Sequence, residues 1–189
     1  MTFVQFHQMK DGTKAEYEML HGLEREYIAG LPGRIIEGIR ALDDGLGGYQ
    51  VTRLQHSLQT ATRAERDGAD IEWVVAALVH DIGDALAPEN HSQLAASILR
   101  PYVRAEVTWV VNMHGVFQQY YYGHHLGLDR DARDHYREHR WFNSCADFCE
   151  RWDQAAFDPT YPTETLEHFF PMVREIFGRV AFDPDTGCE

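Results

Sequence analysis

Potential metal ligands occur along this chain in an order that fits one shared two-metal site. The imidazole and carboxylate groups concerned belong to His56, His80, Asp81, His91, His114 and Asp153. Together these two ligand types suit first-row transition metals such as iron, manganese or zinc. A carboxylate can bridge two ions through its two oxygens, so the adjacent His80 and Asp81 offer a terminal ligand and a bridge from one short stretch. A pair of ions held in this way can orient a substrate and activate water or dioxygen.

The remaining composition is that of an ordinary soluble protein. The chain has 189 residues, 44% of them hydrophobic and 25% charged, which fits one domain with a sizeable core. Its formal net charge of −13 argues against a nucleic-acid partner and against docking on an anionic membrane. No signal peptide or membrane span is visible. The three cysteines form no framework pattern, which indicates a reducing, cytoplasmic location.

The hydrophobic pattern predicts an all-α fold, because no segment alternates β-branched and polar residues between turns. Clustered glycines favour a loop over residues 43–48, Asp70 is a suitable N-cap, and Pro88 suits a first helical turn. The segment from Asp129 to Arg140 is charged on nearly every face and predicts a solvated helix. Predicted helices cover residues 13–29, 33–42, 49–67, 71–79, 88–99, 103 to the His114 region, 129–140, 141–156 and 163–178.

Three of the six ligand positions have a readable helical context. His114 shares an apolar face with three valines of its helix, which points its imidazole into the core. A lone core histidine is more often satisfied by a backbone carbonyl than by a metal, and only the presence of the other five residues favours the metal here. The helix before His80 and Asp81 is apolar on all faces past Glu72, so two ionisable groups at its end are costly to bury unless paired or bound to metal. The alternative is a helix C-terminal cap with Asp81 exposed.

The other three positions give weaker local signals. His56 lies off the apolar stripe of its helix, as a surface histidine also would. His91 follows Pro88 in a first helical turn and has no local pattern of its own. Asp153 shares a face with small apolar residues, which favours an inward position, and Asp147 is the competing choice for the last ligand.

Five stretches around these positions carry a family resemblance: residues 54–61 (LQHSLQTA), 76–83 (AALVHDIG), 91–96 (HSQLAA), the His114 segment, and 151–156 (RWDQAA). They resemble the HD-domain proteins, specifically the dinuclear-iron oxygenase branch that includes myo-inositol oxygenase and the 2-amino-1-hydroxyethylphosphonate oxygenases. The resemblance covers residues 45–178 and implies a single HD-domain helical bundle with a dinuclear metal site in its core. The expected organisation is an N-terminal helical extension over residues 1–44, an HD domain over 45–180 and a disordered tail over 181–189.

The resemblance also implies a cofactor and a reaction. The expected cofactor is two iron ions, in the Fe(II)/Fe(III) state, and the expected reaction uses O2 to cleave a small hydroxylated substrate oxidatively. Asp81 is the implied bridge, and Asp153 is favoured over Asp147 because this branch carries its last ligand in an Arg-Trp-Asp sequence. The two irons are then bound by His56, His80 and Asp153 on one side and by His91 and His114 on the other.

Substrate-binding residues transfer less directly. The phosphonate oxygenases carry a Lys and an Arg at the positions where this chain has Gln118 and Glu150. Myo-inositol oxygenase carries lysines at the positions where this chain has Asp84 and Phe157. Neither a phosphonate nor inositol itself is therefore supported, and Asp84 either suits an ammonium- or hydroxyl-bearing substrate or merely faces solvent. The segment from Tyr120 to His125 predicts a pocket wall or lid, or else a surface loop. The residues expected near a substrate are Tyr49, Asp84, Gln118, His125 and Glu150.

Two other functions remain open at this point. The wider HD superfamily mostly cleaves phosphate esters with a metal-bound hydroxide, and the same ligands would permit this with manganese or zinc. Few basic residues lie near the ligands in sequence, Arg151 being the obvious one, which argues against a phosphoryl substrate. A binding module with a structural metal is the third reading, and filled coordination would support it.

Overall fold

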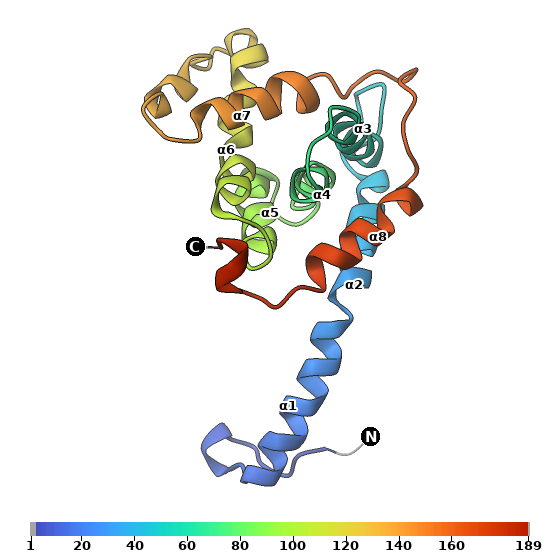
Figure 1. Cartoon of the computed structure of the whole chain (residues 1–189), viewed down its shortest axis with the longest axis vertical. Helices are drawn as coiled ribbons and strands as arrows, with labels where there is room; N and C mark the ends of the chain where they lie inside the picture. The colour runs from blue at the N-terminus through green and yellow to red at the C-terminus, as the bar shows by residue number, and fades with distance from the viewer. Residues whose placement is uncertain (1–2, 189) are drawn as a thin grey trace.

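Within residues 3–188, which the computed structural model describes, the chain is helical and contains no strand (Figure 1). This confirms the predicted all-α class. One π-helical turn, Cys149–Asp153, directly follows α7, and short 3-10 helices occupy several connections. The α-helices are α1 (Lys14–Ala29), α2 (Leu31–Arg40), α3 (Arg53–Arg66), α4 (Ile71–Val79), α5 (His91–Leu99), α6 (Ala105–Tyr122), α7 (Phe142–Phe148) and α8 (Leu166–Phe177).

Helix α4 lies at the centre of the bundle because it is apolar on nearly every face (Figure 1). The Asp70 carboxylate caps it by accepting hydrogen bonds from the backbone N–H groups of Glu72 and Trp73, at 3.0 and 3.2 Å. Helices α3, α6 and α8 pack against α4, while α5 packs on α6 and α2 on α8. The chain leaves α4 inside the bundle, which places His80 and Asp81 in the interior.

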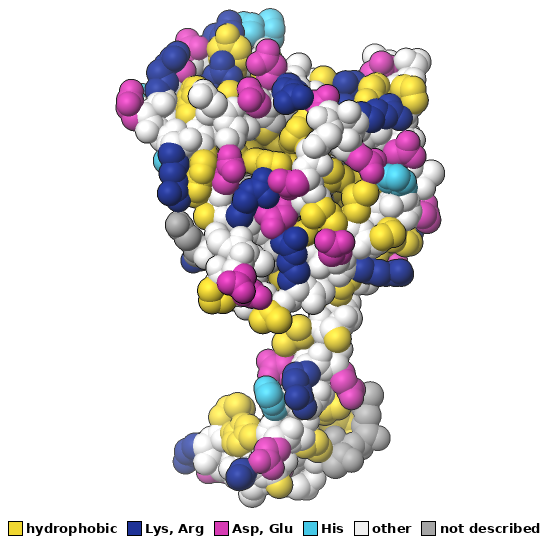
Figure 2. All heavy atoms as spheres, in the orientation of Figure 1, with side chains coloured by type: hydrophobic (Ala, Val, Ile, Leu, Met, Phe, Trp, Pro, Cys, Tyr) yellow, Lys and Arg dark blue, Asp and Glu magenta, His cyan; other side chains and the backbone are white. Residues whose placement is uncertain are grey.

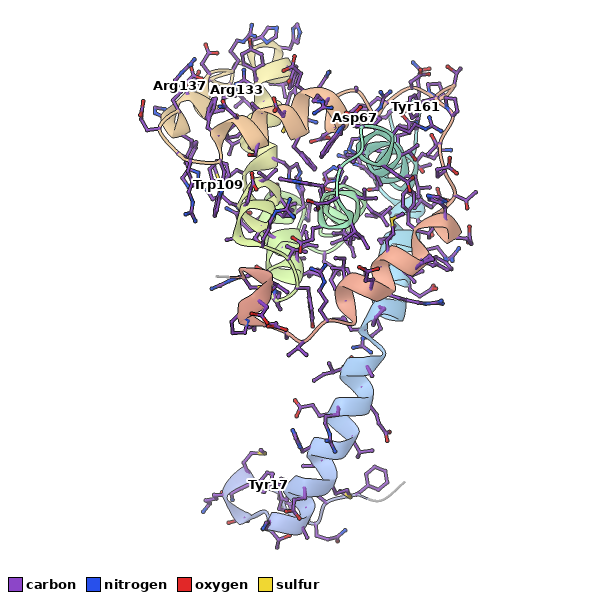
Figure 3. All side chains as sticks on the ribbon, in the orientation of Figure 1. Tyr17, Asp67, Trp109, Arg133, Arg137 and Tyr161 are labelled. Atoms are coloured by element: carbon purple, nitrogen blue, oxygen red, sulfur yellow. The ribbon has the colours of Figure 1, made fainter. Side chains whose placement is uncertain are left out.

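The N-terminal part of the chain divides into a projecting helix and a packed one. Helix α1 extends away from the bundle, with Tyr17 near its far end, and none of its residues is buried (Figure 3). A reciprocal pair of hydrogen bonds between Thr13 and Glu16 caps its first turn. Helix α2 instead buries Ile36 and Ile39 against the core. The bundle therefore begins at α2, within the segment expected to be an extension.

The C-terminal segment is packed in the structure, where we expected disorder from residue 181. The backbone N–H of Phe182 donates to the carbonyl of Pro101 at 2.7 Å, and the N–H of Ala105 donates to the carbonyl of Gly187 at 3.0 Å. These bonds satisfy backbone groups at the start of α6 and hold the segment against the bundle. Glu189 lies outside the described residues.

The predicted helix over residues 129–140 was wrong, because only residues 132–136 form a short 3-10 helix there. This segment has no apolar stripe, and an isolated helix without packing is marginal in water. Its arginines are used locally instead: the Arg133 guanidinium lies 3.5 Å from the Tyr120 ring centre, and Arg137 pairs with Asp134 at 2.7 Å (Figure 3). Helix α6 in turn continues to Tyr122, through much of the segment considered as a lid or loop.

The surface carries both signs of charge. Acidic and basic side chains are interspersed over the face shown in Figure 2, and no single-sign patch dominates it. Among the described residues, no helix has both the length and the apolar character that crossing a membrane requires.

Candidate metal centre

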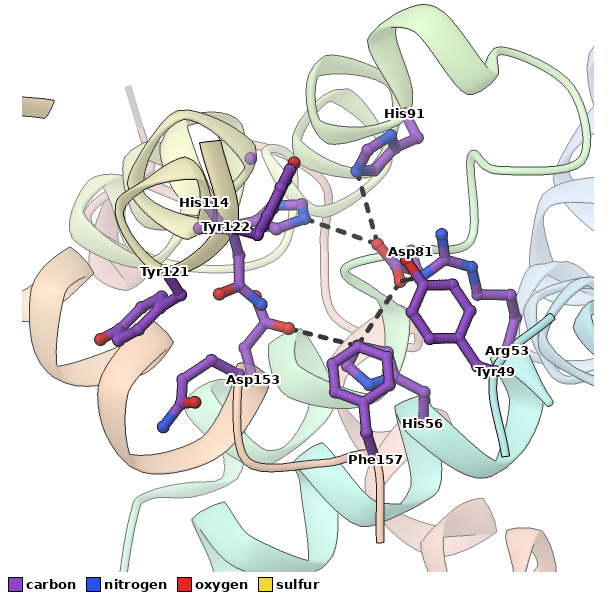
Figure 4. A pocket seen from close by; sticks show the side chains of 13 residues that line it. Tyr49, Arg53, His56, Asp81, His91, His114, Tyr121, Tyr122, Asp153 and Phe157 are labelled. Carbon is purple, nitrogen blue, oxygen red and sulfur yellow. Dashed lines mark hydrogen bonds and ion pairs between the residues drawn. The ribbon is translucent and has the colours of Figure 1, made fainter. Parts of the chain in front are cut away.

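The six predicted ligand residues come from five separate segments and meet in one place. Figure 4 shows this cluster without His80, which does not line the cavity. Helix α3 supplies one, the end of α4 supplies two, α5 and α6 supply one each, and the π-helical turn supplies the last. All are buried except His91, whose side chain is 26% exposed at the rim. These residues are His56, His80, Asp81, His91, His114 and Asp153.

A close backbone contact brings the α5 segment to this place. A Cβ atom on Gly83 would lie 2.7 Å from the carbonyl oxygen of His91 and 2.9 Å from its Cα. Because both neighbours are backbone atoms, no side-chain adjustment could relieve that clash. Glycine at position 83 thus lets His91 approach the end of α4.

Hydrogen bonds to backbone carbonyls fix the tautomer of all four histidines. The Nδ1–H group of each ring donates to a carbonyl, which leaves its Nε2 lone pair free. All four Nε2 atoms lie within 3.7 Å of a carboxylate oxygen of Asp81 or Asp153. The four bonds join His56 to Ala156 at 3.0 Å, His80 to Ala77 at 2.7 Å, His91 to Pro88 at 3.2 Å and His114 to Val111 at 2.6 Å.

The two oxygens of Asp81 face two different pairs of histidines. Its Oδ1 lies 3.5 Å from the Nε2 atoms of both His91 and His114. Its Oδ2 lies 3.6 Å from His56 Nε2 and 3.5 Å from His80 Nε2. One carboxylate thus divides the imidazoles into two sets, which is the geometry that a bridging carboxylate needs.

Asp153 belongs to the set around Oδ2 of Asp81. Its Oδ1 lies 3.2 Å from His56 Nε2 and 3.7 Å from His80 Nε2, while its Oδ2 is buried without a hydrogen-bond partner in the described part of the chain. The Nε2 atoms of His56 and His80 are themselves only 3.1 Å apart. Facing lone pairs and an orphaned carboxylate oxygen are costly to bury, and a proton or a cation between them relieves that cost.

The electrostatics of the cluster show how the metal-free protein satisfies these groups. Burial alone would lower the pKa of His56 and His80, but the carboxylates of Asp153 and Asp81 outweigh burial and raise both pKa values. Burial would likewise raise the pKa of Asp81, but His80 and His114 hold it well below its usual range. Burial would also raise the pKa of Asp153, but the hydrogen bonds and charges of His56 and His80 outweigh burial and lower it. Protons on imidazoles therefore take the place that metal cations can fill.

The donor set fits a pair of transition-metal ions. His56, His80 and Asp81 could hold one ion, and Asp153, whose Oδ1 lies 3.2 Å from His56 Nε2, could complete that position. Asp153 also comes close to His80 and His114 together. Asp81 joins His91 and His114 around a second position, which has fewer protein donors and lies at the rim. Fewer donors leave coordination positions for water or substrate, as catalytic metal sites require.

The π-helical turn explains how Asp153 reaches the centre. The N–H of Gln154 donates to the carbonyl of Cys149 at 3.0 Å, a bond that spans five residues instead of four. The turn is anchored to the C-terminal end of α3, because Trp152 Nε1 donates to the carboxylate of the C-cap residue Asp67 at 2.7 Å. Asp147, the competing ligand candidate, lies one turn earlier on α7 and is exposed.

A cavity of about 320 Å³ opens beside the cluster. Its size is typical of small-molecule sites. Tyr49 and Gln118, two of the five expected substrate residues, line this cavity. Tyr121 and Tyr122, from the segment for which we considered a pocket wall or lid, also line it. From the sequence we did not identify the other side chains that shape it, which are Arg53, Gln154 and Phe157.

The other three expected substrate residues do not line the cavity. Asp84 is turned toward Arg53, with its Oδ2 2.9 Å from the Arg53 Nε, and its Oδ1 lies 3.7 Å from His91 Nδ1. Its charge is therefore compensated, which removes the reason to expect an ammonium group beside it. His125 lies past the end of α6 against His124, and Glu150 points outward from the π-helical turn; both are exposed.

Aromatic side chains form part of the cavity wall next to the ligands. The Phe157 ring stacks on His56 with ring centres 4.4 Å apart, and Tyr49 lies 5.1 Å from Phe157 (Figure 4). Burial, followed by the charges of Cys149 and Glu150, raises the pKa of Tyr121 to about 12. Burial also raises the pKa of Tyr122, with Tyr49 as the next cause. These phenols therefore stay neutral and act as hydrogen-bonding groups in the wall.

Comparison with known proteins agrees with this geometry. The model of the HD domain family matches residues 53–143. The chain is 32% identical over 104 residues to a 1-hydroxy-2-(trimethylamino)ethylphosphonate dioxygenase (glycine-betaine-forming) of Leisingera caerulea, covering 47% of this chain and 53% of that protein. It is 28% identical over 159 residues to a hydroxymethylphosphonate dioxygenase of Gimesia maris, covering 66% of this chain and 79% of that protein.

The chain thus resembles the HD domain family over residues 53–143. The match spans about half the length of the Leisingera relative. The matched residues 53–143 include every ligand position except Asp153.

Proposed function

We propose that this protein is a non-haem diiron oxygenase that uses O2 to cleave a small hydroxylated substrate oxidatively. The observation that carries the proposal is the division of the two Asp81 oxygens between two pairs of histidines. A structural or mononuclear site has no need of such a bridge. The names of both relatives, which describe dioxygenases, support the same chemistry.

In this proposal the protein residues hold and shield the iron pair. His56, His80 and Asp153 fill one side, so the side of His91 and His114 is where a substrate hydroxyl has room to approach from the cavity. An iron pair supplies the electrons and the O2 chemistry when bound. Phe157 and the tyrosines of the cavity wall exclude bulk water from that side.

Hydroxylated phosphonates are the first substrates to test, since both relatives are named for them. Glu150, whose charge argued against a phosphonate, is exposed and does not line the cavity. Gln118, in place of the Lys of the phosphonate oxygenases, does line it and offers a neutral amide. Of the two reasons against an anionic substrate, the charge of Glu150 therefore no longer applies, and the replacement of a Lys by Gln118 remains.

A metal-dependent phosphohydrolase is the second candidate, and one observation favours it. Arg53 lines the cavity and provides the cation that the sequence alone did not place near the ligands. A metal-bound hydroxide with a neighbouring arginine would suit a phosphate ester.

Oxygen consumption separates the two candidates. The protein is first loaded with iron under anaerobic conditions. It is then mixed in oxygenated buffer with hydroxymethylphosphonate or with related small hydroxylated compounds, and O2 uptake and product formation are measured. Substrate-dependent O2 uptake that is lost in His91→Ala supports the oxygenase. Rapid hydrolysis of phosphate esters by iron, manganese or zinc forms, with no O2 uptake for any hydroxylated compound, would establish the hydrolase instead. Asp147→Asn, a change at an exposed carboxylate outside the centre, is the matched control.

A further inference from the structure

Arg53 holds a distinctive place in the cavity beside the metal centre. Among the residues that the structure describes, it is the one lysine or arginine side chain that lines this cavity. It arises from the first turn of α3, three residues before His56, so the two side chains share a helical face. The side chain is 18% exposed and reaches toward Asp81 (Figure 4).

Contacts within the protein use only part of the Arg53 guanidinium. Its Nε lies 2.9 Å from the Asp84 carboxylate, which balances its charge. Its Nη1 makes one long contact, 3.5 Å, with Asp81 Oδ2. No hydrogen bond or ion pair in the described part of the chain uses Nη2. The outer edge of the guanidinium, the edge that binds a carboxylate or phosphonate through two parallel hydrogen bonds, is thus available.

The position of Arg53 limits where the bound anion can lie. Because Nη1 lies 3.5 Å from Oδ2 of Asp81, an anion held by this guanidinium lies directly beside the metal centre. A substrate hydroxyl directed to the centre and an anion on Arg53 must then be on the same or on neighbouring carbon atoms. The overall charge permits this, since Fe(II) and Fe(III) together carry more charge than the carboxylates of Asp81 and Asp153, and Arg53 offsets Asp84.

We propose that Arg53 is a specificity-determining residue that holds the anionic group of the substrate, selecting small anions with a hydroxyl on or next to the carbon that bears the charge. The proposal rests on the proposed function for the metal centre. Tyr49 and Asp84 are positioning residues in this account. The Tyr49 ring centre lies 5.3 Å from the guanidinium carbon, and the Asp84 carboxylate lies 2.9 Å from Nε. Together these two contacts hold the guanidinium in place and leave its outer edge for the anion.

Binding measured without turnover tests this role. Wild type, Arg53→Gln, Arg53→Lys and the control Arg66→Gln are loaded with zinc, and their metal content is determined. Arg66 lies on the same helix but is exposed and pairs with Glu164 outside the cavity. Glycolate, hydroxymethylphosphonate and the neutral ethylene glycol are then titrated by calorimetry.

The expected result is a selective loss of anion affinity. Replacing Arg53 by Gln should lower the binding affinity for both anions by between about tenfold and a hundredfold, which is the contribution expected of charge-assisted hydrogen bonds. The affinity for ethylene glycol should not change. Unchanged anion affinity in Arg53→Gln overturns the proposal. If Arg53→Gln does not retain two metals, Arg53→Lys decides: it keeps the charge but not the paired hydrogen bonds, so unchanged glycolate affinity in that variant overturns the proposal as well.

The same variants separate this inference from the oxygenase proposal. A protein that binds anions through Arg53 but consumes no O2 with any of them retains the arginine role and loses the oxygenase assignment. A protein that consumes O2 with glycolate or hydroxymethylphosphonate, with a KM for that anion that Arg53→Gln does not alter, retains the oxygenase assignment and loses the arginine role.

Discussion

Replacing Asp81 by Asn should lower the stability of the metal-free protein by an amount that depends on pH. The substitution preserves the size of the side chain and removes only its charge. Asp81 lies 3.5–3.6 Å from the Nε2 atoms of four histidines, two of which, His56 and His80, have raised pKa values. At this distance, one protonated imidazole and the carboxylate attract each other by about 5 kcal/mol at an effective dielectric constant of about 20.

The sign follows from the protonation of His56 and His80. A raised pKa means that their contribution is fully present below the unperturbed value of 6.5 and is lost as pH rises through the folded value. Near pH 6 the variant should therefore lose about 3 to 5 kcal/mol of unfolding free energy, as expected when one partner of a buried ion pair is removed. At alkaline pH, above the raised pKa values of His56 and His80, these imidazoles are neutral and Arg53, 3.5 Å from Oδ2, is the charged partner that Asp81 keeps. The loss of unfolding free energy on replacement by Asn should therefore be smaller there than near pH 6.

Urea unfolding of chelator-treated wild type and Asp81→Asn at both pH values measures this effect. Metal analysis of reconstituted samples adds a second readout, because loss of the bridge should reduce binding from two ions to one or none. The exposed Asp147→Asn serves as the control and should behave as wild type in both assays. An equal loss of stability at both pH values, or retention of two ions by Asp81→Asn, would refute the reasoning.

Three further predictions follow from the same contacts. His91→Ala should bind one ion instead of two by metal analysis and keep its melting temperature within about 2 °C when metal-free, because His91 is at the exposed rim; binding of two ions would contradict the assignment. Metal affinity should rise as pH increases through the raised pKa values of His56 and His80, since metal must displace their protons; an affinity that is flat with pH between about 6 and 8 argues against these ligands. Glu72→Gln should lower the unfolding free energy by about 1.5 to 3 kcal/mol by chemical denaturation, because buried Glu72 accepts charged hydrogen bonds from Arg104 at 2.9 Å and Arg179 at 2.5 Å; a change below about 0.5 kcal/mol would show that these bonds contribute little.

Much of the bundle and the ligand cluster could be predicted from the sequence because both depend on short-range patterns. The Asp70 cap and the apolar run after it define α4 with the bounds that the structure shows, Ile71–Val79. The valine stripe likewise turns His114 inward. Burial of α4 and α6 then places their histidines in the interior, where only pairing or metal makes them tolerable.

The parts that could not be predicted depend on long-range packing. Nothing in residues 129–140 reveals that their arginines stack on Tyr120 in place of forming a helix. The π-helical turn that aims Asp153 also has no local signature. Arg53 is different, because its three-residue spacing to His56 is a signal that could have indicated a shared helical face but that our sequence analysis did not use. The contact with Asp84, which holds its guanidinium beside the centre, required the structure.

Low-temperature electron paramagnetic resonance of the iron-loaded protein, partly reduced without oxygen, tests the central claim most directly. The account predicts two irons per chain and the signal of an antiferromagnetically coupled Fe(II)/Fe(III) pair, lost in Asp81→Asn and retained in Asp147→Asn. Uptake of a single iron, or of two irons without spin coupling, would contradict the bridge assigned to Asp81 and with it the diiron oxygenase.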